Sequence, residues 1–130
     1  TAVAILTLVA VVLSVRSLPY GYRVPKQDYM DAVTFVERTM ESGDRVIVVS
    51  HGGEIPIVRY LGRPWTRIDS GADLEAVRRD GRPVWVISTF RSYIQSGHPD
   101  LWNILTTQCA EMHKVAATVA DGAIVVHRCP

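Results

Sequence analysis

The chain has 130 residues, of which 48% are hydrophobic, and its formal net charge is +1 at pH 7. This length suits one domain with its own hydrophobic core and is too short for two ordinary domains. The 14 basic and 13 acidic residues are scattered along the chain, so the sequence predicts no basic patch of the kind that binds nucleic acid.

The first segment of the chain is an uncharged apolar run, TAVAILTLVAVVLSV. After Thr1 its only polar residues are Thr7 and Ser14, whereas a helix on the surface of a soluble protein has a polar face. About 20 apolar residues span a bilayer, and the run here is cut short by the first residue of the chain. We therefore expect residues 1–16 to be the end of a transmembrane-type helix that anchors the chain to a membrane. A buried core helix or strand is the alternative.

Residues 17–27 contain two prolines and a glycine and are predicted to be a connector. A soluble α/β domain is predicted over residues 28–130. Its first helix begins after Asp28, which suits the N-cap position. Val33 and Val36 lie at helical spacing and are expected to face the core.

Short apolar runs and helix-like segments alternate through the rest of the domain. Strands are predicted at 45–50, 64–69 and 83–90, and helices at 53–63, 70–82 and 91–109, the last at least from Pro99 onward. The segment 113–129 contains two β-rich runs joined by Asp121-Gly122, a pair that favours a tight type I′ turn. This order predicts an α/β fold: a short Rossmann-like, mostly parallel sheet flanked by helices and closed by a carboxy-terminal antiparallel hairpin.

Polar residues and glycines follow the predicted strands. In open α/β sheets, ligands bind at the carboxyl ends of the strands, so these residues form a candidate crevice: Ser50, His51, Gly52, Gly53, Glu54, Asp69, Ser88 and Arg91. Serine, aspartate and glycine also occur at the same places as ordinary capping and turn residues, and that alternative stays open. The sequence predicts no catalytic residue, no metal site and no cofactor.

The only two cysteines, Cys109 and Cys129, lie in the last quarter of the chain. They form a disulfide if the domain faces an oxidising compartment, and otherwise they are two separate small core residues.

The segment VVSHGG, from Val48 to Gly53, resembles the second histidine motif of the histidine phosphatase superfamily. That resemblance implies that His51 contacts a phosphoryl group. The mechanism of the family also needs a first histidine in an RHG motif, and this chain contains no RHG. A histidine-phosphatase-like fragment is therefore the third hypothesis for function.

A second resemblance covers nearly the whole chain. Its features are a K-x-D-x-x-x-A helix start (Lys26, Asp28, Ala32), a G-D-x-V strand start (Gly43, Asp44, Val46), a Y-L-x-R helix end (Tyr60, Leu61, Arg63), an R-x-W-V-I strand (Arg82, Val84, Trp85, Val86, Ile87, with Pro83 inserted) and a terminal D-G-x-I-V-V hairpin (Asp121, Gly122, Ile124). In this order, after an apolar helix, they resemble the carboxy-terminal end of GT-C-type membrane glycosyltransferases of the protein mannosyltransferase and aminoarabinose-transferase-like group.

This resemblance implies that a last transmembrane helix leads into a small α/β domain outside the cytoplasm. The catalytic acids of that group lie in the first extracytoplasmic loop, near a polyprenyl-phosphate-linked sugar, so no residue of this chain takes that role. We therefore expect a non-catalytic accessory domain on the periplasmic side. The expected partners are the membrane, the upstream transmembrane part of the same protein, and the lipid-linked sugar or its acceptor. The alternative is a stand-alone α/β binding or structural module.

Overall fold

A computed structural model describes residues 2–23 and 26–130, with side chains described for 2–16 and 26–130. The helices are α1 (Ala2–Arg23), α2 (Tyr29–Thr39), α3 (Ser50–Gly53), the π-helical segment η1 (Glu54–Tyr60), α4 (Gly71–Arg78), α5 (Arg91–Gly97) and α6 (Pro99–Thr107). The strands are β1 (Arg45–Val49), β2 (Thr66–Ile68), β3 (Val84–Ser88), β4 (Ala110–Val115) and β5 (Ile124–Cys129).

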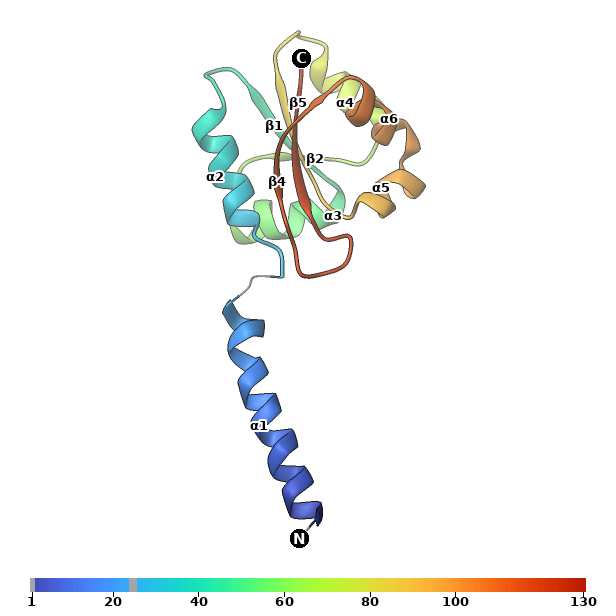
Figure 1. The fold of residues 1–130 in the computed structure, drawn as a ribbon. Helices are drawn as coiled ribbons and strands as arrows, with labels where there is room; N and C mark the ends of the chain where they lie inside the picture. Colours follow the sequence, from blue (N-terminus) through green and yellow to red (C-terminus); the bar gives the residue numbers. More distant parts are fainter. Residues whose placement is uncertain (1, 24–25) are drawn as a thin grey trace.

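The amino-terminal helix α1 extends away from the α/β domain (Figure 1). Its large apolar side chains are exposed, from 46% at Val12 to 77% at Val3. No helix among the described residues is both long enough and apolar enough to cross a membrane. The helix continues to Arg23, beyond the predicted boundary at residue 16 and into the predicted connector over 17–27, of which residues 24 and 25 lie outside the described residues.

The five strands form one mixed sheet in the order β2-β1-β3-β5-β4. β1 pairs in parallel with β2 and with β3, while β5 pairs antiparallel with β3 and with β4. The α/β class is confirmed, and the terminal hairpin lies at one edge of the sheet as expected. The sheet is mixed rather than mostly parallel, because two of its four strand pairings are antiparallel.

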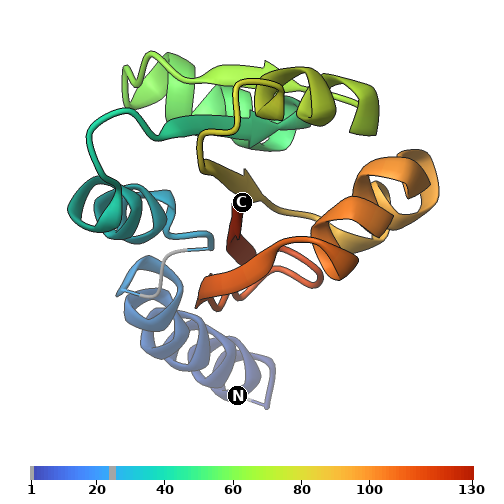
Figure 2. The ribbon, with the colours of Figure 1, turned by 90° about the horizontal axis from the view of Figure 1, so that it is seen from above.

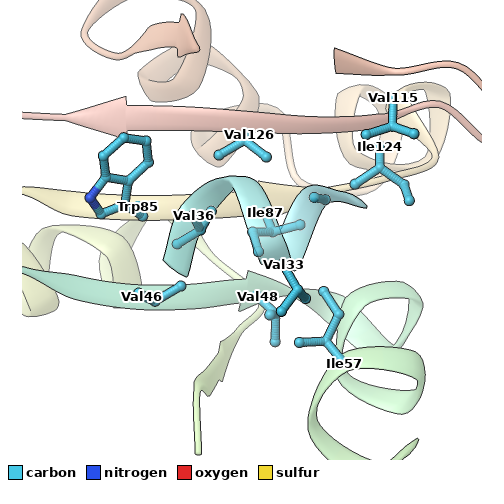
Figure 3. Packing of buried hydrophobic residues seen from close by; sticks show 11 residues of the cluster. Val33, Val36, Val46, Val48, Ile57, Trp85, Ile87, Val115, Ile124 and Val126 are labelled. Carbon is cyan, nitrogen blue, oxygen red and sulfur yellow. The ribbon is translucent and has the colours of Figure 1, made fainter. Parts of the chain in front are cut away.

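Helices cover both faces of the sheet, and each face has its own hydrophobic core. Figure 2 shows α2 on one side and α5 and α6 on the other. Figure 3 shows the α2 side, where Val33 and Val36 pack against β-strand residues such as Val48 and Val126. The opposite core joins Ile47, Val84 and Val86 of the strands to residues of α4, α5 and α6, including Leu74, Leu101 and Leu105.

Local sequence explains where two of these helices begin. Asp28 is the N-cap of α2, and its carboxylate accepts a hydrogen bond of 3.0 Å from the Asp31 backbone N–H. Ser70 and Asp73 form a capping box at the start of α4. Each cap satisfies backbone N–H groups that have no partner inside the helix, which typically contributes about 1 kcal/mol.

Two features of the resemblance meet in the core. Asp44 directly precedes β1, and its carboxylate accepts a hydrogen bond of 2.8 Å from the indole N–H of Trp85 on β3. This bond holds the pKa of Asp44 below its ordinary value. Trp85 is 1% exposed and lies opposite Val46 in the strand register, so this bond links the residue before β1 to a buried ring on β3.

The predicted tight hairpin turn is wrong. The last pair between β4 and β5 is Val115 with Ile124, so residues 116–123 form a longer loop between them. A type I′ turn requires positive φ at both central residues. Asp121 has φ 59°, but Gly122 is not among the positive-φ glycines of the described chain.

Candidate functional site

The carboxyl ends of β1 and β3 are each followed by a non-glycine residue at positive φ. Ser50, directly after β1, has φ 56°, and Phe90, two residues after β3, has φ 55°. A side chain at positive φ costs energy and persists only where the surrounding structure imposes it. In an α/β sheet this edge is also where ligands usually bind, so the strain marks it as a candidate site.

Gly52 and Gly53, after β1, do not supply the positive φ that turn glycines often have, which was the alternative left open by their sequence. The helix begins at Ser50 and contains both glycines. A Cβ atom at Gly52 would lie 3.0 Å from Cγ2 of Thr89, and one at Gly53 would lie 3.0 Å from Cβ of Val48. They are therefore small because the helix packs closely on the sheet. The positive φ that the turn requires falls on Ser50 instead.

Ser50 itself does not face an open crevice. It is 6% exposed, and its hydroxyl accepts a hydrogen bond of 3.3 Å from the Gly52 N–H. The Gly52 carbonyl accepts a hydrogen bond of 3.0 Å from the hydroxyl of Tyr29. These two hydrogen bonds use the polar groups of Ser50 and Gly52 within the fold. The segment therefore has a structural role.

His51, Glu54, Arg59, Arg67 and Asp69 form a network of ion pairs at the ends of β1 and β2, which we call the Glu54 cluster. Glu54 accepts hydrogen bonds from Nη1 of Arg67 at 2.7 Å and from Nη2 of Arg59 at 3.1 Å. Nδ1 of His51 lies 3.0 Å from Glu54 Oε2. Arg67 also pairs with Asp69 at 2.8 Å. Each carboxylate of the cluster therefore already has an arginine partner.

These pairings set the charge states of the cluster. Hydrogen bonds from Arg67 and then Arg59 lower the pKa of Glu54 to about 2. The same bond to Glu54, with help from Asp69, raises the pKa of Arg67. A general base works best with a pKa near the operating pH, so Glu54 is a poor base at neutral pH. The geometry suits a structural network better than proton transfer.

A cavity lies elsewhere, between the β3–β5–β4 part of the sheet and the helices α5 and α6. Its volume is about 520 Å³, within the range of small-molecule sites. Six lining residues carry most of the polar chemistry, and we call the cavity that they line the β4–β5 groove: Ser88, Arg91, Trp102, Glu111, Lys114 and His127.

The strand register explains why these side chains share one face. His127 of β5 lies between Val86 of β3 and Glu111 of β4. Directly opposite residues in antiparallel strands point to the same side of the sheet. Val86 belongs to the core on the side of α4, α5 and α6. His127 and Glu111 therefore face those helices too.

His127 is the unusual residue of the groove. His127 is 6% exposed. Its Nδ1 is buried without a hydrogen-bond partner among the described residues. Burial lowers the pKa of His127, and the charge of Glu111 partly offsets this effect. An unsatisfied buried polar atom costs about 1–3 kcal/mol.

The predicted crevice thus divides into separate groups. His51, Glu54 and Asp69 lie in the Glu54 cluster, and Ser88 and Arg91 line the β4–β5 groove. Ser50, Gly52 and Gly53 pack in the structural turn between β1 and η1. The eight residues of the predicted crevice therefore lie in three groups near the ends of neighbouring strands.

The sequence patterns did not predict several residues of these two regions. Arg67 lies on a predicted strand, where its charge could have indicated pairing with Glu54 across adjacent strand ends. His127 and Glu111 alternate with apolar residues on β5 and β4, but the signal becomes readable only once the hairpin register is known. Cys109, which lines the groove, forms a disulfide with Cys129.

Among the described residues, no three His, Cys, Asp or Glu side chains are grouped so that they could hold a metal ion. Comparison of the chain with protein-family models, with curated proteins and with solved structures found no match.

Proposed function

We propose that this α/β domain is a non-catalytic accessory domain of a membrane glycosyltransferase that uses a polyprenyl-phosphate-linked sugar. The domain lies on the extracytoplasmic side and packs beside the membrane-embedded part of the same protein. The observation that carries this proposal is the exposed apolar surface of α1, which is continuous in sequence with a domain that contains a disulfide.

The apolar surface of α1 supports attachment to an apolar phase. Residues such as Val3, Leu6 and Leu13 expose 77%, 70% and 62% of their surface. Exposed apolar area costs about 25 cal/mol per Å² in water, and contiguous patches of this kind mark membrane or protein contacts. The surroundings that relieve the cost are the bilayer and the upstream transmembrane helices.

The disulfide supports an extracytoplasmic position. Disulfides form and persist in oxidising compartments such as the bacterial periplasm, whereas cytosolic thiols are kept reduced. Cys109 and Cys129 are bonded to each other, and the described residues contain no free cysteine. Together with the resemblance in motif order, this bond favours a domain outside the cytoplasm.

Membrane retention and sugar transfer test the proposal. The complete gene is expressed in bacteria, and the protein is followed in carbonate-washed membranes. We expect the wild-type protein to stay in the membrane fraction and to label from the periplasmic side. Membranes that contain it should transfer sugar from a polyprenyl-phosphate donor. The 130-residue chain, expressed alone, should show no transfer.

A matched pair of variants isolates the role of α1. In the chain expressed alone, Leu6→Glu with Leu13→Glu should shift it to the soluble fraction, whereas Leu6→Met with Leu13→Met should leave it in the membrane. A wild-type chain found wholly in the soluble fraction, or membranes of the complete protein without transfer activity, would refute the proposal. The first result would favour a stand-alone α/β module.

The phosphatase hypothesis has less support. The His51 side chain is 67% exposed and its ring is engaged with Glu54. Its test is direct, since phosphate release that is lost in His51→Ala would restore that hypothesis.

A further inference from the structure

The β4–β5 groove has a clear structural origin. The two sheet faces of the hairpin are covered unequally. On one face α2 packs against both β4 and β5. On the other face α5 and α6 pack over the core around Val86 and Leu105. The groove lies between these two helices and the β4–β5 hairpin. Figure 2 shows the two helix layers on opposite sides of the sheet.

The walls of the groove combine an aromatic ring with polar groups of both kinds. The guanidinium of Arg91 lies 4.9 Å from the centre of the Trp102 ring, which holds it in place through a cation–π contact. Ser88 and Lys114 lie in one row across the sheet, with Val125 between them. The guanidinium of Arg91 and the ammonium of Lys114 therefore line the same space, whereas the Ser88 hydroxyl donates a hydrogen bond of 3.4 Å to the Val125 carbonyl.

Acceptors balance these donors. Glu111 lies opposite His127 in the strand register, and Asp121 lines the same cavity. Within the part of the chain that the structure describes, Arg91, Lys114 and Glu111 form no ion pair. Their hydrogen-bonding capacity is thus available to a ligand.

This balance selects one class of ligand. Two cations and two carboxylates line the groove, so an anion would meet repulsion from Glu111 and Asp121 as well as attraction. A wholly apolar ligand would leave the lining polar groups without partners, and this loss is costly. A neutral ligand with many hydroxyls can donate to the carboxylates and accept from Arg91 and Lys114, while one face of its ring lies against an aromatic side chain.

We propose that the β4–β5 groove binds a neutral saccharide of one or two rings. Arg91, Glu111 and Lys114 bond to its hydroxyls, and Trp102 provides an apolar wall. The buried imidazole of His127, which has no partner in the described chain, gains one from a sugar hydroxyl after a small ring rotation.

This inference deepens the proposed function and rests on it for the origin of the saccharide, which would be the transferred sugar or a glycan acceptor. The binding itself is measured on the isolated chain and does not require a membrane. A chain that binds sugar but is not retained in membranes would refute the proposed function alone, and a retained chain that binds no sugar would refute the groove alone.

The test is an NMR titration of the full 130-residue chain, labelled with ¹⁵N and held in a detergent that has neither a sugar nor a phosphate headgroup. The probes are maltose, cellobiose and lactose, and inorganic phosphate serves as the anionic comparison. We expect saturable shifts of the Trp102 indole N–H and of the His127 ring, with a Kd on the order of 1 mM for at least one disaccharide.

Variants separate the groove from the rest of the surface. Trp102→Leu and Glu111→Gln should each weaken binding about tenfold, which corresponds to about 1.4 kcal/mol. Glu41→Gln, outside the groove, should leave binding unchanged. Lys114→Gln at an exposed position is the substitute if Trp102→Leu does not fold. The proposal is overturned if all three disaccharides give no saturable shift up to about 100 mM, if shifts arise outside the groove, or if phosphate alone binds.

Discussion

The Glu54 cluster and the β4–β5 groove are both rich in charged side chains, yet they use them in opposite ways. In the cluster, Glu54 pairs with Arg59 and Arg67 and its pKa falls to about 2. In the groove, Arg91 and Glu111 face a cavity of about 520 Å³ without an ion-pair partner among the described residues. Charges that neutralise each other hold strand ends together, whereas charges left facing a cavity remain available to a ligand.

The largest effect that separates the two regions should come from the disulfide. Cys109, which lines the groove, is bonded to Cys129, and the two are 20 residues apart in sequence. A link across a loop of this length limits the unfolded chain and typically stabilises the folded state by about 3 kcal/mol. The double variant Cys109→Ser, Cys129→Ser should lose about that much free energy of unfolding in a urea titration.

Reductant provides the control for this measurement. The wild-type chain in dithiothreitol should approach the stability of the double variant, and the double variant should not respond to reductant. Resonances of the groove should change in both cases, while those of His51 and Glu54 should stay in place. An equal change in the Glu54 cluster would show that the two regions are not independent.

Much of the fold could be read from local sequence, but the grouping of site residues could not. The β-branched run of β1 and the cap residue Asp28 specify their elements through nearest neighbours, and both appear as expected. The groove depends on β5 pairing beside β3, a contact between segments about 40 residues apart that no local pattern determines. Once that pairing is known, the alternation along β5 places His127 on the groove face without further information.

The glycines after β1 show the same limit. Glycine usually supplies positive φ in a turn, and the sequence left open that Gly52 and Gly53 are ordinary turn residues. Here Ser50 takes the positive φ, and Gly52 is needed for close packing against Thr89. Steric contact between a helix and a neighbouring strand is a tertiary property, and a single sequence does not reveal it.

An intermediate effect is expected at His127, and its sign is the informative part. Its buried Nδ1 has no partner in the described chain, so replacing the ring with an apolar side chain removes an unsatisfied group. His127→Leu should therefore raise the free energy of unfolding by about 1 kcal/mol at pH 7, while weakening saccharide binding. If His127 only stabilised the fold, His127→Leu would instead lower the free energy of unfolding.

The pH dependence sharpens the same test. Burial lowers the pKa of folded His127 below its ordinary value of 6.5, so the unfolded chain binds the proton more readily. Wild-type stability should then fall as the pH drops through 6.5 toward the folded pKa, and this part of the slope should be missing in His127→Leu. His113→Leu is the matched control. His113 bonds to Asp31 at 3.1 Å and stacks on Phe35, so its loss should destabilise the chain.

The smallest effect is expected in the Glu54 cluster, because its ion pairs are close to solvent and water screens them. Glu54→Gln should lower the free energy of unfolding slightly at pH 7 and leave disaccharide binding in the groove unchanged.

The folded pKa of Glu54, about 2, lies below the ordinary value of 4.5. The stabilisation by Glu54 is therefore complete above pH 4.5 and is lost as the pH falls from 4.5 through about 2. Urea titrations at pH 7, 4 and 3 should show that the difference in stability between wild type and Glu54→Gln becomes smaller as the pH falls. If Glu54→Gln instead weakened sugar binding, the paired cluster would belong to the ligand site, and the contrast between paired and available charges would not describe this molecule.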